Sequence, residues 1–542
     1  RSTLFPYTTL FRSALACRPN AGTDLAEVFG HLIATSSRGW SNSEAKTYAD
    51  RLVQYAGEKN KGARVESLNT ILSTSRGQDI DGDGTDETVG LDYNDMFLSE
   101  LAVKFEGFKS QGGYDSRTAP NGRTNVFGNG SNALEGIVHA LTGNPDVATA
   151  WLTVRKSDGT VDDDATAQRT KALINRATQD GWMLEGTWSD QWEDDWLMLS
   201  AEESIRAGKD SNRGTAQAAI TSGVLNAIGT TGDTIELTTA GKNSLSIALS
   251  NYVYGVQQSA SPDGVEGWTI PIDEGDGWAK GMPLQPVIAQ AALTNLLGQV
   301  GMDDYATTRF IGAQEAFNKQ QVAGSQGKDE AFVRSVYHDQ SNLRGYTAGA
   351  IARQSEINGA DADEKVGAWA RATKLAINAI PLPQTKGAGV ALDVGTKFAL
   401  GAGKSATADG AEKGIMDMFG GEEDKKKEEN QKIRDAGSRA NTYLQVLSVL
   451  GSDVYSQEEM ATMAGDNEGI GIGEIINEEG ELRIGINHLN PNDPYLTNDQ
   501  KQALKQVGKT LPVNNHPGMT DFAEEAQENY GKGYDKAHGQ AR

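Results

Sequence analysis

The stretch from Asp79 to Glu87 constrains this chain most, because carboxylates recur there on alternate residues with glycines between them. It reads Asp79-Ile80-Asp81-Gly82-Asp83-Gly84-Thr85-Asp86-Glu87. A calcium loop takes oxygen ligands from alternate positions and needs glycine at the sixth position for its sharp turn. With Asp79 in the first position, Gly84 falls in the sixth. The sequence therefore predicts a calcium site formed by Asp79, Asp81, Asp83, Glu87 and the backbone carbonyl oxygen of Thr85.

The end of this loop departs from the usual calcium pattern. Its twelfth position is Gly90 instead of a bidentate glutamate, and the nearest carboxylate is Asp92. We therefore expect weak affinity, with a Kd on the order of 10⁻⁴ to 10⁻³ M, as in extracellular modules. The alternative is a solvated acidic turn in which Asp92 caps the next helix. Predicted helices over 63–74 and from Asp92 onward flank the loop, so the order resembles that of an EF-hand.

Charge and composition exclude several classes of partner. The 542 residues hold 50 Lys+Arg against 74 Asp+Glu, a formal net charge of −24. Nucleic-acid binding relies on an electropositive surface, so we expect no nucleic-acid partner. No apolar run reaches the length of a membrane-spanning helix, so we expect no transmembrane span. The single cysteine, Cys17, excludes an internal disulfide. We therefore expect the partners of this chain to be proteins.

The first residues do not look like part of a fold. The stretch Thr3–Ser13 resembles the translation of a sequencing-library adapter, and we treat Arg1–Ser13 as a sequence artefact. The alternative is a signal peptide that ends at Ala14-Leu15-Ala16-Cys17, which resembles a lipobox.

Apolar residues recur at helical spacing over most of the chain, which predicts a mainly α protein with two or three helical domains. One minor β-hairpin is expected near 472–486. The predicted segments are an N-terminal helical domain with the acidic loop over 14–157, a helical domain over 165–258, a helical bundle over 284–405, a charged linker over 406–432, and a C-terminal helical segment with the hairpin over 433–542.

Two further motifs invite a chemical interpretation. Trp188, Trp192 and Trp196 share one helical face near Glu193 and Asp195. Two acids beside an aromatic-lined cleft would suit a hydrolase of cell-wall glycans, whereas large aromatic side chains on one face more commonly form a core. The run over 403–405 resembles the end of a phosphate-binding loop but lacks its opening glycine. We assign no catalytic residue and no cofactor except calcium.

Two segments carry a family resemblance. They are Leu91-Asp92-Tyr93 with Met96-Phe97-Leu98-Ser99-Glu100-Leu101, and the stretch from Leu134 through Ala140-Leu141-Thr142-Gly143-Asn144-Pro145-Asp146-Val147-Ala148-Thr149-Ala150-Trp151-Leu152. This order resembles an actinobacterial family of helical proteins of unknown function, associated with type VII (WXG-type) secretion.

The resemblance implies a non-enzymatic structural or interaction protein that is secreted or held at the bacterial cell surface. A cytoplasmic location is the alternative. Tyr495 and Asp499 match the short Tyr-x-x-x-Asp signal of type VII substrates, although Asn498 or Asp499 would serve equally as a helix cap. The competing functions are a cell-wall-acting hydrolase, through Glu193 or Asp195, and a secreted effector.

Overall fold

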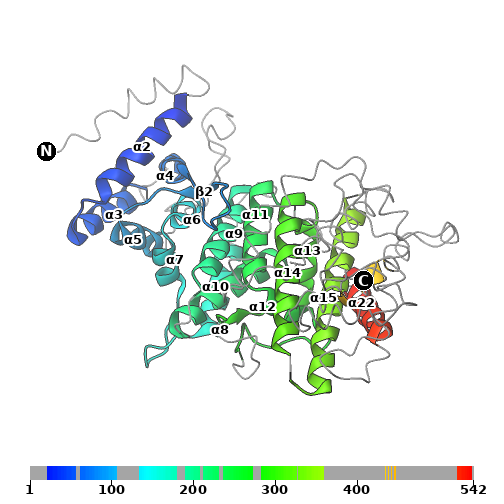
Figure 1. Ribbon diagram of the computed structural model, residues 1–542. Helices are drawn as coiled ribbons and strands as arrows, with labels where there is room; N and C mark the ends of the chain where they lie inside the picture. Colours follow the sequence, from blue (N-terminus) through cyan, green and yellow to red (C-terminus); the bar gives the residue numbers. More distant parts are fainter. Residues whose placement is uncertain are drawn as a thin grey trace.

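A computed structural model describes most of the chain (Figure 1). The described residues are 21–56, 62–106, 134–179, 190–207, 211–230, 236–272, 282–325, 327–358, 434, 437–438, 441, 445–446 and 522–539. They form fifteen helices and two small antiparallel sheets of two strands each. The prediction of a mainly α protein is confirmed.

The N-terminal part consists of four helices, α2 (Ala21–Ser37), α3 (Asn42–Ala56), α4 (Gly62–Leu72) and α5 (Asp95–Glu106). Ser41 and Glu44 form a reciprocal capping box at the start of α3, since the Glu44 carboxylate accepts the Ser41 amide at 2.9 Å and its hydroxyl at 2.7 Å. The large apolar side chains of α3 do not form its most buried face. Tyr48 and Tyr55 are 37% and 40% exposed. Alanines are buried in their place, because small side chains let α3 lie close to α5.

A two-stranded hairpin separates α4 from α5. Strand β1 (Ser75–Gln78) pairs antiparallel with β2 (Glu87–Gly90), and Gln78 stands opposite Glu87 at the end that carries the acidic loop. The expected helix–loop–helix order therefore holds only coarsely, because strands and not helices adjoin the loop directly. The pairing brings the first and ninth loop positions close together.

The middle of the chain is a layer of short and medium helices. These are α6 (Glu135–Thr142), α7 (Pro145–Leu152), α8 (Asp163–Gln179), α9 (Asp190–Ile205), α10 (Ser211–Ile228), α11 (Thr239–Asn251) and α12 (Val253–Ala260). Pro145 occupies the first turn of α7, where its missing N–H costs nothing. The helical stretch over 239–260 is divided at Tyr252, whose φ of −116° and ψ of 34° are not helical.

Three further helices lie on the far side of this layer (Figure 1). They are α13 (Gln290–Val300), α14 (Asp304–Gly324) and α15 (Glu330–Ile357), preceded by the small sheet of β3 (Thr269–Ile270) and β4 (Gln285–Pro286). The C-terminal helix α22 (Phe522–Gly539) packs along α15. Gly345 and Gly349 face the backbone carbonyls of Tyr530 and Tyr534 so closely that a methyl group at either glycine would overlap them.

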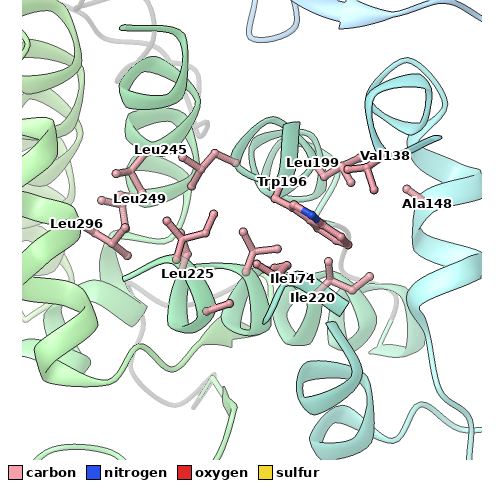
Figure 2. Packing of buried hydrophobic residues seen from close by; sticks show 14 of the residues in the cluster. Val138, Ala148, Ile174, Trp196, Leu199, Ile220, Leu225, Leu245, Leu249 and Leu296 are labelled. Atoms are coloured by element: carbon pink, nitrogen blue, oxygen red, sulfur yellow. The ribbon is translucent and has the colours of Figure 1, made fainter. Parts of the chain in front are cut away.

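One contiguous hydrophobic core runs through the described helices, and it includes residues of each predicted helical segment. Trp192 and Trp196 are 1% and 0% exposed and pack edge to face with ring centres 5.6 Å apart. Figure 2 shows Trp196 among Ile174, Ile220 and Leu199. The interpretation of the tryptophan face as core is confirmed for these two residues.

Several sequence predictions lie outside the described residues. They are the hairpin near 472–486, the linker over 406–432, the run over 403–405, the motif over 495–499, and Trp188. No helix in the described part of the chain combines the length and the apolar character needed to cross a membrane.

Candidate metal centre

The acidic loop is folded around the carboxylate of Asp79. Its Oδ1 accepts the backbone amides of Gly82 at 2.7 Å and Asp83 at 3.1 Å, and its Oδ2 accepts that of Gly84 at 3.0 Å. Gly82 and Gly84 have φ values of 78° and 85°, in the left-handed region that side chains disfavour. The two glycines are therefore required by the backbone, and they turn the amides inward.

Three carboxylates converge in this loop. Ligand oxygens of Asp79, Asp81 and Glu87 all lie within 4.8 Å of one another. Oxygens that bind one calcium ion at about 2.3–2.6 Å are separated by at most about 5 Å, so the group fits a single ion. Asp79 is exposed, whereas Glu87 is buried. The site thus has a buried floor and an open side through which an ion and its waters can enter.

Asp83 and Thr85 are placed differently from the other predicted ligands. The Oδ1 of Asp83 accepts the Thr85 amide at 2.7 Å, and its Oδ2 accepts the Tyr305 hydroxyl and one N–H of Arg309 at 2.7 Å. The Asp83 carboxylate is thus occupied by α14, and Thr85 is exposed. Calcium ligation by these two residues stays a prediction.

Arg309 links the loop to α14 across more than two hundred residues of sequence. Its side chain is 2% exposed, and its Nη2 lies 2.9 Å from Asp81 Oδ2 and 2.7 Å from Asp83 Oδ2. The guanidinium also stacks 4.7 Å from the centre of the Tyr305 ring. Its Nη1 donates to Ser246 Oγ of α11 at 3.2 Å. Arg309 and Tyr305 are contributors that sequence reasoning missed, because nothing local to either segment indicates the contact.

The charges in the loop do not balance. Asp79, Asp81, Asp83, Asp86 and Glu87 supply five carboxylates, and Arg309 is the cation that contacts them within the described residues. Burial, with a smaller effect of Asp81 and Asp83, raises the pKa of Glu87 to about 7. An ionised Glu87 is therefore costly in the metal-free loop.

The two carboxylates that contact Arg309 have pKa values shifted in opposite directions. Burial raises the pKa of Asp81 against the opposing charge of Arg309, and its Oδ2 is buried without a hydrogen bond directed to it. Burial also opposes the charge on Asp83, but the hydrogen bonds from Tyr305 and Thr85 and the charge of Arg309 outweigh it and lower the pKa of Asp83. The lower pKa of Asp83 thus follows mainly from the hydrogen bonds that Tyr305 and Thr85 donate to it, while Arg309 pairs with both carboxylates.

The alternative interpretation of the loop gave Asp92 the role of helix cap, and that prediction is wrong. Asn94 caps α5 instead, since its Oδ1 accepts the Phe97 amide at 3.1 Å. Asp92 is half exposed and lies 3.6 Å from Arg38. Gly90, at the twelfth loop position, packs so closely on the backbone of His139 that no side chain fits there. The missing glutamate is therefore explained by packing.

The hydrolase hypothesis requires acids that face an open cleft lined by aromatic residues, and Asp195 is buried instead. Asp195 is 5% exposed, and its Oδ1 lies 2.7 Å from His139 Nδ1. Trp192 and Trp196 belong to the core and do not line an open cleft. Trp192 and Trp196 therefore stabilise the fold and present no surface to a glycan.

Comparison with known proteins assigns the chain to a family. No curated protein and no solved structure matches the chain. One family model, described as a family of unknown function (DUF6571), matches residues 9–541. This match covers nearly the whole chain, so the protein belongs to this family of unknown function.

Proposed function

We propose that this protein is a structural or interaction protein of the bacterial exterior, in which calcium fastens the N-terminal hairpin to the helical core. Asp79, Asp81 and Glu87 would hold the ion. The observation that carries this proposal is the convergence of three carboxylates within 4.8 Å at the end of one hairpin. Clustered like charges destabilise a fold unless a cation binds them, so a divalent ion is the simplest partner for this geometry.

The buried contacts around the loop indicate what the ion would do. Asp81 belongs to the group of three converging carboxylates and also pairs with Arg309 of α14. An ion that fixes Asp81 also fixes the acceptor on which Arg309 docks. Calcium and the Arg309 contact should therefore stabilise each other, because both depend on one loop conformation.

The test is a thermal unfolding experiment on the full chain, in calcium and after calcium depletion. A ligand at about a hundred times its Kd adds roughly 2.7 kcal/mol, enough for a measurable rise in Tm. Asp79→Asn should lose this rise, because it removes one ligand charge while keeping the size of the side chain. Asp158→Asn is the matched control, since Asp158 also accepts a backbone amide two residues on, in an exposed turn. Equal calcium responses in the wild type and Asp79→Asn would refute the site.

The proposed location rests on two supports. One is the resemblance of the segments near Leu91 and Leu134 to proteins associated with type VII secretion in actinobacteria. The other is the incomplete ligand set, which predicts an affinity suited to the millimolar calcium found outside cells. Expression of a tagged chain in an actinobacterial host with and without its type VII machinery tests the link. Release that is independent of the machinery would remove it.

A further inference from the structure

A second cluster of chemically capable side chains lies where the hairpin meets α6 and α9. Ser75 Oγ, at the start of β1, lies 3.0 Å from His139 Nε2. The other ring nitrogen, Nδ1, lies 2.7 Å from Asp195 Oδ1. These three residues come from three elements that are up to 120 residues apart, and no sequence motif joins them.

One tautomer of the imidazole satisfies both contacts. If Nδ1 carries the proton and donates it to Asp195, Nε2 is free to accept the proton of the Ser75 hydroxyl. This is the arrangement in which a histidine acts as a general base toward a serine while a carboxylate orients the ring. The Gln191 side-chain amide also lies 3.1 Å from Nδ1. The Gln191 atom concerned is Nε2, which can only donate, so with the proton on Nδ1 this contact is not a hydrogen bond and Asp195 Oδ1 is the acceptor for that proton.

Asp195 and His139 are more deeply buried than Ser75, as a serine nucleophile that must meet its substrate requires. We call these three residues the relay. Asp195 and His139 are 5% and 2% exposed, whereas Ser75 is only partly buried. The base and its carboxylate are thus shielded from water, and the hydroxyl lies nearest the surface. Asp195 Oδ2 is buried without a hydrogen bond, so the carboxylate is directed to the imidazole alone.

We propose that Ser75 is an activated nucleophile, with His139 as its general base and Asp195 as the residue that orients the base, and that it accepts acyl groups from esters. The hairpin packs tightly on α6, since Gly90 has no room for a side chain beside His139. Substrate must therefore approach Ser75 from the solvent side, where this side chain is partly exposed. This proposal goes beyond the binding role of the loop and does not depend on calcium.

The proposed reaction balances without a further reagent. The Ser75 Oγ–carbon bond forms as the hydroxyl proton passes to His139 Nε2. The carbon–oxygen bond of the ester then breaks, and the leaving alkoxide takes the proton from Nε2. Water, deprotonated by the same nitrogen, hydrolyses the acyl-serine to release the acid and restore Ser75.

Covalent labelling tests the nucleophile directly. The full chain is incubated with a small fluorophosphonate, in which the Oγ–phosphorus bond replaces the phosphorus–fluorine bond and fluoride leaves. Mass spectrometry of peptides should place one adduct on Ser75. Ser75→Ala should abolish labelling, whereas Ser73→Ala, the matched control two residues away, should keep it.

Asp195→Asn separates an activated serine from one that is merely accessible. Because an asparagine favours the wrong histidine tautomer, the rate of labelling should fall by roughly 10²- to 10⁴-fold. Circular dichroism must show the same helical content as in the wild type. The proposal is overturned if Ser75 in the folded wild type acquires no adduct, or if Asp195→Asn is labelled at the wild-type rate.

Discussion

Replacement of Glu87 by glutamine gives the sharpest prediction about the acidic loop. Glu87 is buried, and its Oε2 accepts the backbone amide of Ile80 at 3.2 Å. Glutamine keeps the size of the side chain and a carbonyl oxygen that can accept the same amide, but it removes the charge. In the absence of calcium, we expect Glu87→Gln to be more stable than the wild type at neutral pH.

The magnitude follows from the pKa of Glu87, which rises from its ordinary value of 4.5 to about 7 in the folded protein. A group with a raised folded pKa contributes most stability while it is protonated. That contribution is lost as the pH rises from the unfolded pKa through the folded pKa. At 1.36 kcal/mol per pKa unit, the metal-free wild type carries a cost of about 3 kcal/mol at pH 7, and roughly 2 kcal/mol of this cost appears above about pH 5.

The assay is thermal unfolding of both proteins in calcium-depleted buffer at several values of pH between about 5 and 7. The Tm advantage of Glu87→Gln should be small at the acid end and grow toward neutrality. Calcium should then raise the Tm of the wild type more than that of the variant, because the variant has lost a ligand charge. A variant that is less stable than the metal-free wild type at pH 7 would refute this reasoning.

Two further predictions concern packing and the buried ion pair. Arg309→Met should lower the free energy of unfolding by about 3–5 kcal/mol, because it leaves Asp81 and Asp83 buried without their cation. Denaturant unfolding should show that the Arg309→Met/Asp83→Asn double variant regains part of this loss. A double variant that regains none would argue against the pairing. Gly345→Ala should lower stability by about 1–3 kcal/mol, because its methyl group meets the backbone of Tyr530. Gly312→Ala in α14 is its control, since the added methyl group meets no neighbouring element within 4 Å. It should raise stability by about 0.5–1 kcal/mol. Equal Tm values for the two variants would contradict the close packing of α22 on α15.

Helical periodicity predicted most of the described helices, because their apolar residues recur at a fixed spacing. Periodicity alone does not show which face is buried where the neighbouring helix lies very close. In α3, small residues such as Ala45 and Ala49 form the contact, and the larger Tyr48 and Tyr55 remain partly exposed. A hydrophobicity pattern weighs size and apolarity, whereas close helix packing favours small side chains. The break at Tyr252 had no proline or glycine to signal it.

The candidate metal centre could be predicted only in part, for a related reason. Alternating acids and glycines identify the loop, since they act through neighbouring backbone. The contact with Arg309 and Tyr305 depends on how α14 packs on the hairpin, which local sequence does not encode. That contact pairs Arg309 with both Asp81 and Asp83, and Asp81 also belongs to the converging group with Asp79 and Glu87. The relay from Ser75 to Asp195 was hidden in the same way.

A calorimetric titration of the calcium-depleted full chain with calcium tests the central claim most directly. The account predicts binding of one ion with a Kd on the order of 10⁻⁴ to 10⁻³ M, and the binding heat should disappear in Asp79→Asn and persist in Asp158→Asn. Absence of binding at millimolar calcium, or the same heat in the wild type and Asp79→Asn, would contradict it and leave the loop as an acidic turn held to α14 by Arg309 alone.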